Sequence, residues 1–276
     1  MLADLHTHSL FSFDGKPHST MENIAEAAIA AGLTHIAITD HCDIDCELLG
    51  LYRPLDRDAA FAAMTALKEQ YRGRIEVLCG IELGQAHHCP ADARALLAEH
   101  PYDIVLGSLH NLEREKDFCF FDFASFDADT CNAYFNRVLT EALELCKFDG
   151  IHVMTHLTYM DRYMHRAGKA LDVTHHRDGL CRLLEKVVAR GLTLELNTSC
   201  LGDGLGMPTP EILTLYRELG GTRVCLGSDA HAPDRITQYF AEGAAMLRSC
   251  GFTELTLPTR EGVLTYPIFE PLKETL

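Results

Sequence analysis

The sequence of 276 residues has no tryptophan and few basic side chains. Its 24 Lys and Arg stand against 40 Asp and Glu, which gives a formal net charge of −16. A protein that binds the backbone of a long nucleic acid needs a basic surface, and many proteins that bind single strands add stacking aromatics. This composition therefore disfavours a long nucleic acid as a partner.

The sequence also lacks an apolar run that could cross a membrane, which takes about 18 or more residues. Its first residues carry neither the basic stretch nor the apolar core of a signal peptide. The 11 cysteines include no Cys-x-x-Cys pair, and several lie inside apolar runs, which predicts reduced thiols packed in a core. We therefore expect no membrane partner and a cytoplasmic location.

No proline-rich linker or low-complexity tract divides the chain, so a single domain covering residues 1–276 is expected. Short apolar runs alternate with longer amphipathic stretches, as in repeated strand–helix units. The predicted strands are residues 3–5, 35–39, 75–81, 104–109, 151–155, 192–197 and 224–228. The predicted helices are residues 20–31, 56–71, 90–99, 127–147, 172–190, 209–219 and 234–250. This α/β alternation fits either a closed barrel or an open doubly wound sheet.

The sequence is rich in histidine, with 15 residues, and the placement of some of them separates the two folds. A residue able to bind metal stands at or just after the end of six of the seven predicted strands; only the sixth strand lacks one. An open sheet keeps its outer strand ends apart, whereas a closed barrel brings all of them to one rim. The placement therefore favours a barrel with a metal site at that rim. The residues are His6, His8, His41, Glu82, His110, His156, Asp229 and His231.

Two local patterns add detail to this metal site. His6 and His8 stand at the end of the first predicted strand, and because residues two apart in a strand point to the same face, both can turn toward the mouth of the barrel and bind one ion. Asp4 lies on the same side and is expected to orient an imidazole. Glu82 can bridge two ions through its two oxygens. His87, in the loop after the third predicted strand, is a further candidate for the rim and for contact with substrate.

Seven motifs, in this order, resemble one known family. They are D-L-H-T-H-S-x-x-S-x-D-G at 4–15, I-T-D-H at 38–41, G-I-E at 80–82, G-S-L-H at 107–110, T-H at 155–156, E-L-N-T-S at 195–199 and G-S-D-A-H at 227–231. The chain resembles the PHP (polymerase and histidinol phosphatase) superfamily, and most closely its monofunctional histidinol-phosphatase branch. The resemblance spans essentially the whole chain and implies a distorted (β/α)7 TIM-like barrel of the PHP type.

The resemblance also implies three divalent ions, of Zn, Mn or Fe, at the mouth of this barrel. Carried over position by position, the ligands are His6, His8, Glu82 and Asp229 for the first ion, Glu82, His110 and His156 for the second, and Asp14, His41 and His231 for the third. Three carboxylates and six neutral imidazoles around three divalent ions leave a positive site. A small phosphate ester would be drawn to it although the protein surface is acidic.

The chemistry implied by the resemblance is hydrolysis of a phosphate monoester, most closely L-histidinol phosphate in histidine biosynthesis. A hydroxide activated by the ions is expected to attack phosphorus, and the ions are expected to stabilise the charge that develops. The leaving alkoxide must be protonated or held by a cation. Asp229, His231 and Asp40 are the candidate acids for that step.

An arginine fork on the phosphate is also expected in a phosphatase, and Arg162, six residues after His156, is well placed to supply it. Relatives carry a second arginine shortly after the E-L-N-T-S motif, where this chain reads Ser-Cys-Leu-Gly-Asp. This departure weakens the assignment of histidinol phosphate more than it weakens phosphoester hydrolysis. Arg177 or Lys169 could compensate for the missing arginine.

Three alternatives stay open at this point. A PHP phosphoesterase acting on nucleotides or oligonucleotide ends would be expected to need a basic track beside the site. An amidohydrolase-type C–N hydrolase shares the His-x-His strand but commonly has a carboxylated lysine where this chain has Glu82. A non-catalytic PHP module often lacks ligands, whereas all nine positions here hold residues able to bind metal.

Overall fold

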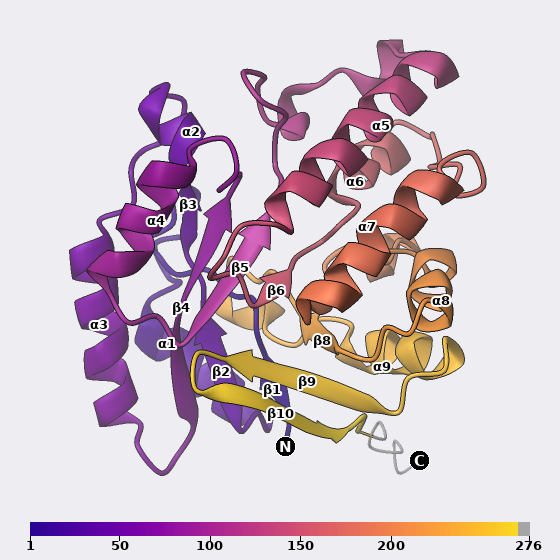
Figure 1. The fold of residues 1–276 in the computed structure, drawn as a ribbon. Coiled ribbons are helices and arrows are strands. Elements are labelled where there is room, and N and C mark those ends of the chain that lie inside the picture. Colours follow the sequence, from indigo (N-terminus) through magenta and orange to yellow (C-terminus); the bar gives the residue numbers. More distant parts are fainter. Residues whose placement is uncertain (270–276) are drawn as a thin grey trace.

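The computed structural model of the protein describes residues 1–269, and its core is a set of parallel strands surrounded by helices (Figure 1). The strands are β1 (Ala3–Asp4), β2 (His35–Ile38), β3 (His41–Asp43), β4 (Glu76–Gly84), β5 (Ile104–Ser108), β6 (Val153–Met154), β7 (Thr193–Asn197) and β8 (Val224–Gly227). They pair in the order β1-β2-β4-β5-β6-β7-β8, and β3 continues the path of β2 along β4.

The sheet closes because β8 returns beside β1. The amide of Leu5 donates a hydrogen bond to the carbonyl of Leu226 at 3.4 Å, and the amide of Asp229 donates to the carbonyl of His6 at 2.9 Å. With β2 and β3 counted as one interrupted strand, the ring has seven strand positions. The distorted (β/α)7 barrel is therefore confirmed, and the open sheet is excluded.

Helices cover the outside of this barrel (Figure 1). They are α1 (Met21–Ala30), α2 (Ile44–Leu48), α3 (Arg57–Gln70), α4 (Pro90–Glu99), α5 (Ala128–Leu145), α6 (Tyr159–Arg166), α7 (Arg177–Arg190), α8 (Pro210–Glu218) and α9 (Phe240–Ser249). Side chains of Thr20, Asp56 and Asp127 accept hydrogen bonds from the first turns of α1, α3 and α5. Such caps satisfy amides that have no partner within the helix and so fix where these helices begin.

An antiparallel hairpin of β9 (Glu254–Thr259) and β10 (Gly262–Pro267) lies across the end of the barrel where the N-terminus is found (Figure 1). Strand β9 packs against β5 and β8. Leu255 and Leu257 are almost fully buried, whereas Leu264 on β10 is 55% exposed. The hairpin therefore covers the core at the end opposite the loops that follow the C-terminal ends of the barrel strands.

All seven predicted strands and all seven predicted helices are present, most with ends shifted by one to a few residues. The sequence prediction missed the hairpin, β3, α2 and α6. Eight of the eleven cysteines are buried, and all eleven are unpaired. Over residues 1–269, no helix is long and apolar enough to cross a membrane. The single domain was predicted over 1–276, and its last seven residues lie outside the described part, so its extent stays a prediction.

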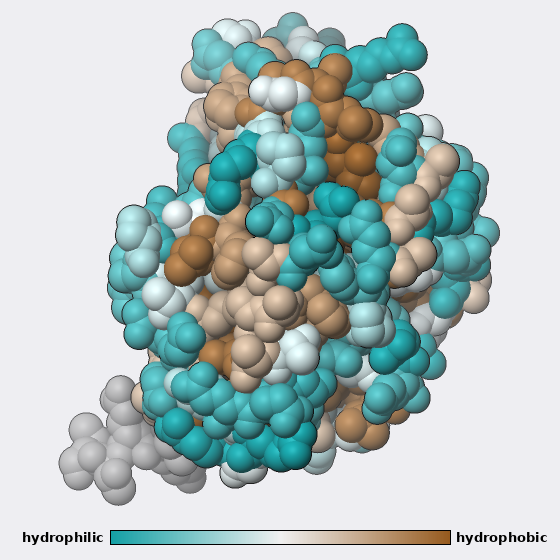
Figure 2. Space-filling view, turned by 90° about the vertical axis from the view of Figure 1, so that its left-hand side faces the viewer, coloured by the Kyte–Doolittle hydropathy of each residue, from teal (hydrophilic) through white to brown (hydrophobic). Residues whose placement is uncertain are grey.

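The surface is not uniformly hydrophilic despite the acidic composition. Figure 2 shows hydrophobic side chains gathered toward the top of the face drawn there, the end at which α2 lies in Figure 1. Leu48 in α2, with Leu49 and Leu51 just after it, are all exposed. The end of the barrel that carries the strand-end loops therefore combines apolar and charged groups.

The hairpin offers a test of how the core is closed. Leu257→Ala should lower the free energy of unfolding by about 2–5 kcal/mol, because it leaves a cavity between β9 and the barrel. Leu264→Ala, at the cross-strand partner of Leu257, should change it by less than about 0.5 kcal/mol, because the side chain is exposed. Denaturant unfolding followed by circular dichroism measures both, and equal losses would contradict this role of β9.

Candidate metal centre

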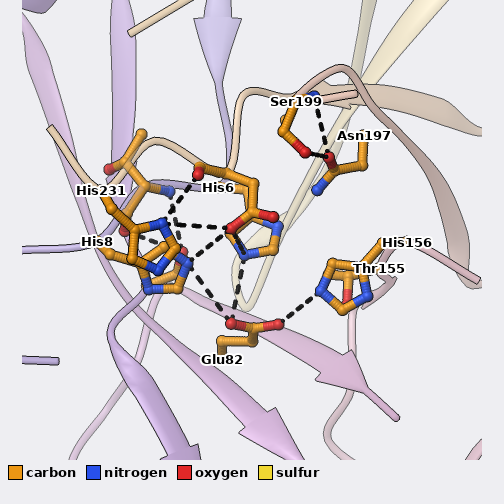
Figure 3. Close-up of polar contacts among 12 residues, drawn as sticks. His6, His8, Glu82, Thr155, His156, Asn197, Ser199 and His231 are labelled. Atoms are coloured by element: carbon orange, nitrogen blue, oxygen red, sulfur yellow. Dashed lines mark hydrogen bonds and ion pairs between the residues drawn. The ribbon is translucent and has the colours of Figure 1, made fainter. Parts of the chain in front are cut away.

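The carboxylate of Glu82 on β4 is fully buried at the mouth of the barrel and is surrounded by imidazoles. Its Oε1 lies 2.9 Å from Nε2 of His156 and 3.1 Å from Nε2 of His110. Its Oε2 lies 3.3 Å from Nε2 of His6 and 2.8 Å from Nδ1 of His41. Figure 3 shows Glu82 between His6 on one side and His156 on the other. The two oxygens therefore face different sets of ring nitrogens, as a bridging ligand requires.

One set of donors joins the first strand to the last. Asp229, just after β8, has its Oδ1 3.2 Å from Nε2 of His8 and 3.7 Å from Nε2 of His6. Both Asp229 and His156 have positive φ angles, of 54° and 23°, which residues with a side chain rarely adopt. Such conformations cluster at functional sites, where the surrounding structure holds them. Here each one turns a donor side chain toward Glu82 or its neighbours.

A second set lies nearer the solvent. Nε2 of His231 is 2.8 Å from Oδ2 of Asp14, and Nε2 of His41 is 4.0 Å from the same oxygen. The Nδ1–H of His231 donates to the carbonyl of Asp229 at 3.0 Å, which leaves Nε2 as the free donor atom. The structure thus brings all nine residues named from the sequence into three adjoining groups.

Several buried donor atoms in these groups have no hydrogen-bond partner in the described residues. They include Nε2 of His6, Nε2 of His8, Oε2 of Glu82, Oδ1 of Asp14 and Nε2 of His231. Buried polar atoms without partners are costly, and acceptors that face one another require a cation between them. Imidazole nitrogens and carboxylate oxygens are the donors that Zn, Mn and Fe prefer. The residues therefore fit several divalent ions.

The charges in the centre point the same way. Burial lowers the pKa of His6, but the carboxylates of Glu195 and Glu82 raise this pKa well above its ordinary value. Burial raises the pKa of Glu82, yet the imidazoles of His41 and His6 hold it well below the usual range. The pKa of His8 lies well below its ordinary value because the ring is buried beside other imidazoles. Glu82 therefore stays ionised, and its negative charge favours a cation or a protonated ring beside it.

Two carboxylates that the sequence analysis did not assign position these rings. Oε1 of Glu195, in β7, lies 2.7 Å from Nδ1 of His6, and its Oε2 accepts from the backbone amide of His156 at 2.8 Å. Oδ1 of Asp43 lies 2.7 Å from Nδ1 of His110. Each ring so held presents its other nitrogen to Glu82. The signal for Glu195 was available, since a Glu inside an apolar parallel strand must have a buried partner.

The role expected for Asp4 is wrong. Its carboxylate accepts hydrogen bonds from the backbone amides of Ser228 at 3.0 Å, Thr237 at 3.1 Å and His6 at 3.4 Å, and no imidazole is among these partners. Its position in β1 points it at the segment after β8, so it stabilises the closure of the barrel. The imidazole of His6 is oriented by Glu195 instead.

Beside the ligands lies a cavity of ≈ 240 Å³. Arg162, on α6, is the one Lys or Arg among its described lining residues. Its Nη2 donates to Oδ2 of Asp229 at 2.9 Å and to Oγ of Ser199 at 2.6 Å. The lining residues are Phe13, Asp14, His41, Tyr52, His110, Asp117, Cys119, Phe120, His156, Tyr159, Arg162, Tyr163, Asp229 and His231.

The model of the PHP domain family matches residues 4–199 of this chain. The chain belongs to the PHP domain family. The histidinol-phosphatase of Lactococcus lactis subsp. lactis is 26% identical to it over 259 residues, which cover 91% of this chain and 92% of that protein. A protein of Clostridium acetobutylicum named "Probable histidinol-phosphatase" is 30% identical over 261 residues, covering 91% of this chain and 94% of that protein.

A solved structure shares the PHP fold of this chain. It is a crystal structure of histidinol phosphate phosphatase from Lactococcus lactis subsp. lactis, complexed with Zn, L-histidinol and phosphate. The two superpose with a TM-score of 0.79 at 21% identity, covering 95% of this chain and 98% of the other.

The other residues named from the sequence take different places in this PHP barrel. Asp229 and His231 line the cavity, whereas Asp40 is buried and accepts from the amide of Ser9 at 2.6 Å and from the hydroxyls of Ser9 and Ser12 at 2.7 and 2.9 Å. Both oxygens of Asp40 are thus engaged with the loop after β1. This position makes Asp40 a support for that loop rather than a group facing the cavity.

Three of the residues named as substrate contacts lie outside the described lining of the cavity. Arg177 on α7 is 58% exposed, with Nη2 3.8 Å from Oε2 of Glu218. Lys169 follows α6, and His87 belongs to a separate cluster with Glu141. Neither Arg177 nor Lys169 therefore belongs to the described lining of the cavity.

The positioning role of Glu195 can be tested by metal affinity. Glu195→Gln removes the charge that holds Nδ1 of His6, so metal affinity should fall by about 10–100-fold. Glu185→Gln, on the exposed face of α7, should leave it unchanged. Zinc competition against a chromophoric chelator measures both affinities. Equal affinities in the two variants would remove Glu195 from the centre.

Proposed function

We propose that this protein is a metal-dependent phosphomonoesterase that hydrolyses L-histidinol phosphate to L-histidinol and phosphate, in cytoplasmic histidine biosynthesis. The observation that carries the proposal is one cavity whose wall combines six of the nine candidate metal ligands, Arg162, and the buried carboxylate of Asp117 among tyrosines. The names of the two relatives support the same substrate. The small phosphorylated ester is the partner that this cavity fits.

The phosphate end of the cavity is formed by the metal ligands together with Arg162. Divalent ions held there supply Lewis-acid charge that activates water and neutralises phosphate oxygens. The side chain of Arg162 is 14% exposed beside Asp229, and its buried Nε has no hydrogen-bond partner among the described residues. A phosphate oxygen would satisfy this group, because a guanidinium binds phosphate through paired N–H donors.

The same cavity wall also holds groups that suit a cationic aromatic group. Asp117 is buried, and one of its oxygens accepts from the hydroxyl of Tyr52 at 3.0 Å while the other accepts from the amide of Cys119 at 2.7 Å. The ring of Tyr52 stacks on Phe13 with centroids 4.0 Å apart. Histidinol phosphate carries an ammonium and an imidazole, which fit a carboxylate and aromatic faces.

Two of the three candidate acids, Asp229 and His231, line the cavity. Burial raises the pKa of Asp229, but the imidazole of His6 and the guanidinium of Arg162 hold this pKa well below its usual range. Asp229 is therefore ionised and has no proton to give to the leaving alkoxide. His231 also lines the cavity and stays the candidate for protonating the leaving alkoxide; because its Nδ1–H donates to the carbonyl of Asp229, the proton would come from Nε2, so this role and metal binding at Nε2 exclude each other.

A substrate screen tests this proposal directly. The value of kcat/KM should be at least about 100-fold higher for L-histidinol phosphate than for nucleoside monophosphates or sugar phosphates, because the buried carboxylate would face no cation in those esters. Asp117→Asn should reduce kcat/KM for histidinol phosphate more than for 4-nitrophenyl phosphate, which has no ammonium. A preference for nucleotides would contradict the proposal and favour a phosphoesterase acting on nucleotides, with the stacked rings of Phe13 and Tyr52 binding a base.

The phosphate contact has its own matched pair of variants. Arg162→Ala should lower kcat/KM for every phosphate ester by about 10–100-fold, the value of a hydrogen bond to a charged group. Arg177→Ala should leave kcat/KM unchanged, because Arg177 is exposed and lies outside the described cavity lining. Steady-state kinetics on purified protein measures both. Similar kinetics for the two variants would exclude Arg162 as the phosphate contact.

A further inference from the structure

A second cluster of possible metal ligands lies outside the cavity. His87 and His88 follow β4, and Glu141 comes from the middle of α5. One donor atom from each of the three lies within 4.8 Å of the others. Nε2 of His88 is 2.6 Å from Oε2 of Glu141, and Nε2 of His87 is 3.5 Å from the same oxygen. Their side chains are 5%, 18% and 11% exposed for His88, Glu141 and His87.

This cluster repeats the arrangement found around Glu82. There, His110 has Asp43 at Nδ1 and Glu82 at Nε2, with distances of 2.7 and 3.1 Å. Here, His88 has Asp45 at Nδ1 at 2.9 Å and a glutamate at Nε2. In each case a carboxylate holds one ring nitrogen so that the other faces a second carboxylate. A carboxylate on the far nitrogen of a ligating histidine is common in metal sites, because it fixes the ring and its tautomer.

The ring nitrogens show what the cluster lacks. When the Nδ1–H of His88 donates to Asp45, its Nε2 lone pair faces a carboxylate oxygen, and two acceptors at that separation need a cation between them. A proton there would satisfy His88 and Glu141. It would leave both ring nitrogens of His87 buried without a partner among the described residues. A metal ion would engage all three side chains once the 2.6 Å contact between His88 and Glu141 widens to the roughly 3.3 Å that separates two ligands of one tetrahedral ion.

We propose that His87, His88 and Glu141 bind a fourth divalent ion, of the zinc class, separate from the three at the cavity. Two imidazoles and one carboxylate are a known zinc donor set, with water in the remaining position. Glu141 is held in place by the backbone amide of Glu113, which lies 3.2 Å from each of its oxygens.

The ion would join three segments that are distant in the sequence. The loop after β4 and helix α5 supply the ligands, and Asp45 of α2 holds the ring of His88. Asp45 also accepts from Nδ2 of Asn111 at 2.8 Å, next to His110. The fourth ion would therefore brace the rim of the barrel behind the phosphatase centre. This inference does not depend on which ester the protein hydrolyses.

The test compares zinc content in the intact protein. Wild type and a His87→Ala/Glu141→Gln variant are equilibrated with buffered Zn²⁺ and desalted, and zinc per chain is measured by plasma mass spectrometry. Wild type should hold one equivalent more than the variant. A His175→Ala/Glu144→Gln variant is the matched control, because both of these side chains are exposed and lie outside the cluster, and it should match wild type. Equal zinc in wild type and the cluster variant would overturn the proposal.

Two further measurements separate loss of the site from loss of the fold. Phosphatase activity of the single Glu141→Gln variant should agree with that of wild type within about twofold, since Glu141 does not lie among the described residues that line the cavity. Single Glu141→Gln protein loaded with Co²⁺ should lose one set of tetrahedral cobalt absorption bands while keeping the circular dichroism of wild type. Unchanged cobalt bands in this folded variant would also overturn the proposal. An inactive wild type with the extra zinc would refute only the phosphatase function.

Discussion

The buried carboxylate of Glu82 is the constraint on which the centre depends. Fully removed from solvent, it would be very unfavourable without positive charge around it. Imidazoles from β3 and from the segments after β1, β5 and β6 surround it, and they meet there because the strands close into a ring. Closure of the barrel therefore brings together the ring nitrogens that face the buried negative charge of Glu82, and bound cations would compensate that charge.

Cations bound in this way explain how an acidic chain can attract a phosphate ester. Arg162 is the one Lys or Arg that the described residues place in the cavity lining, so side chains alone supply little positive charge there. Divalent ions supply it locally, while the formal charge of −16 stays spread over the rest of the molecule. Long polyanions meet that acidic exterior, whereas a single phosphate group can enter the mouth.

Residues at strand ends could be predicted from the sequence, because strand spacing alone places His6 and His8 on one side and brings successive strand ends to one rim. The supports of these rings could not. Glu195 meets His6 over Gly227 of β8, although the two residues are 189 positions apart along the chain, and that pairing depends on β8 lying between β7 and β1 in the ring. Asp4 was misassigned for the same reason, since its nearest partners come from residues after β8. The hairpin of β9 and β10 was missed because no site motif marked it.

The closure between β1 and β8 also sets an order of events during synthesis. His6 and His8 leave the ribosome early, yet Asp229, which completes their donor set, is made more than 200 residues later. Until then the first histidines have no fixed partner on that side. Contacts between such distant residues form late in folding, because a long loop must close first. Metal binding by His6, His8 and Asp229 should therefore accompany the final closure of the barrel and stabilise the contact between its first and last strands.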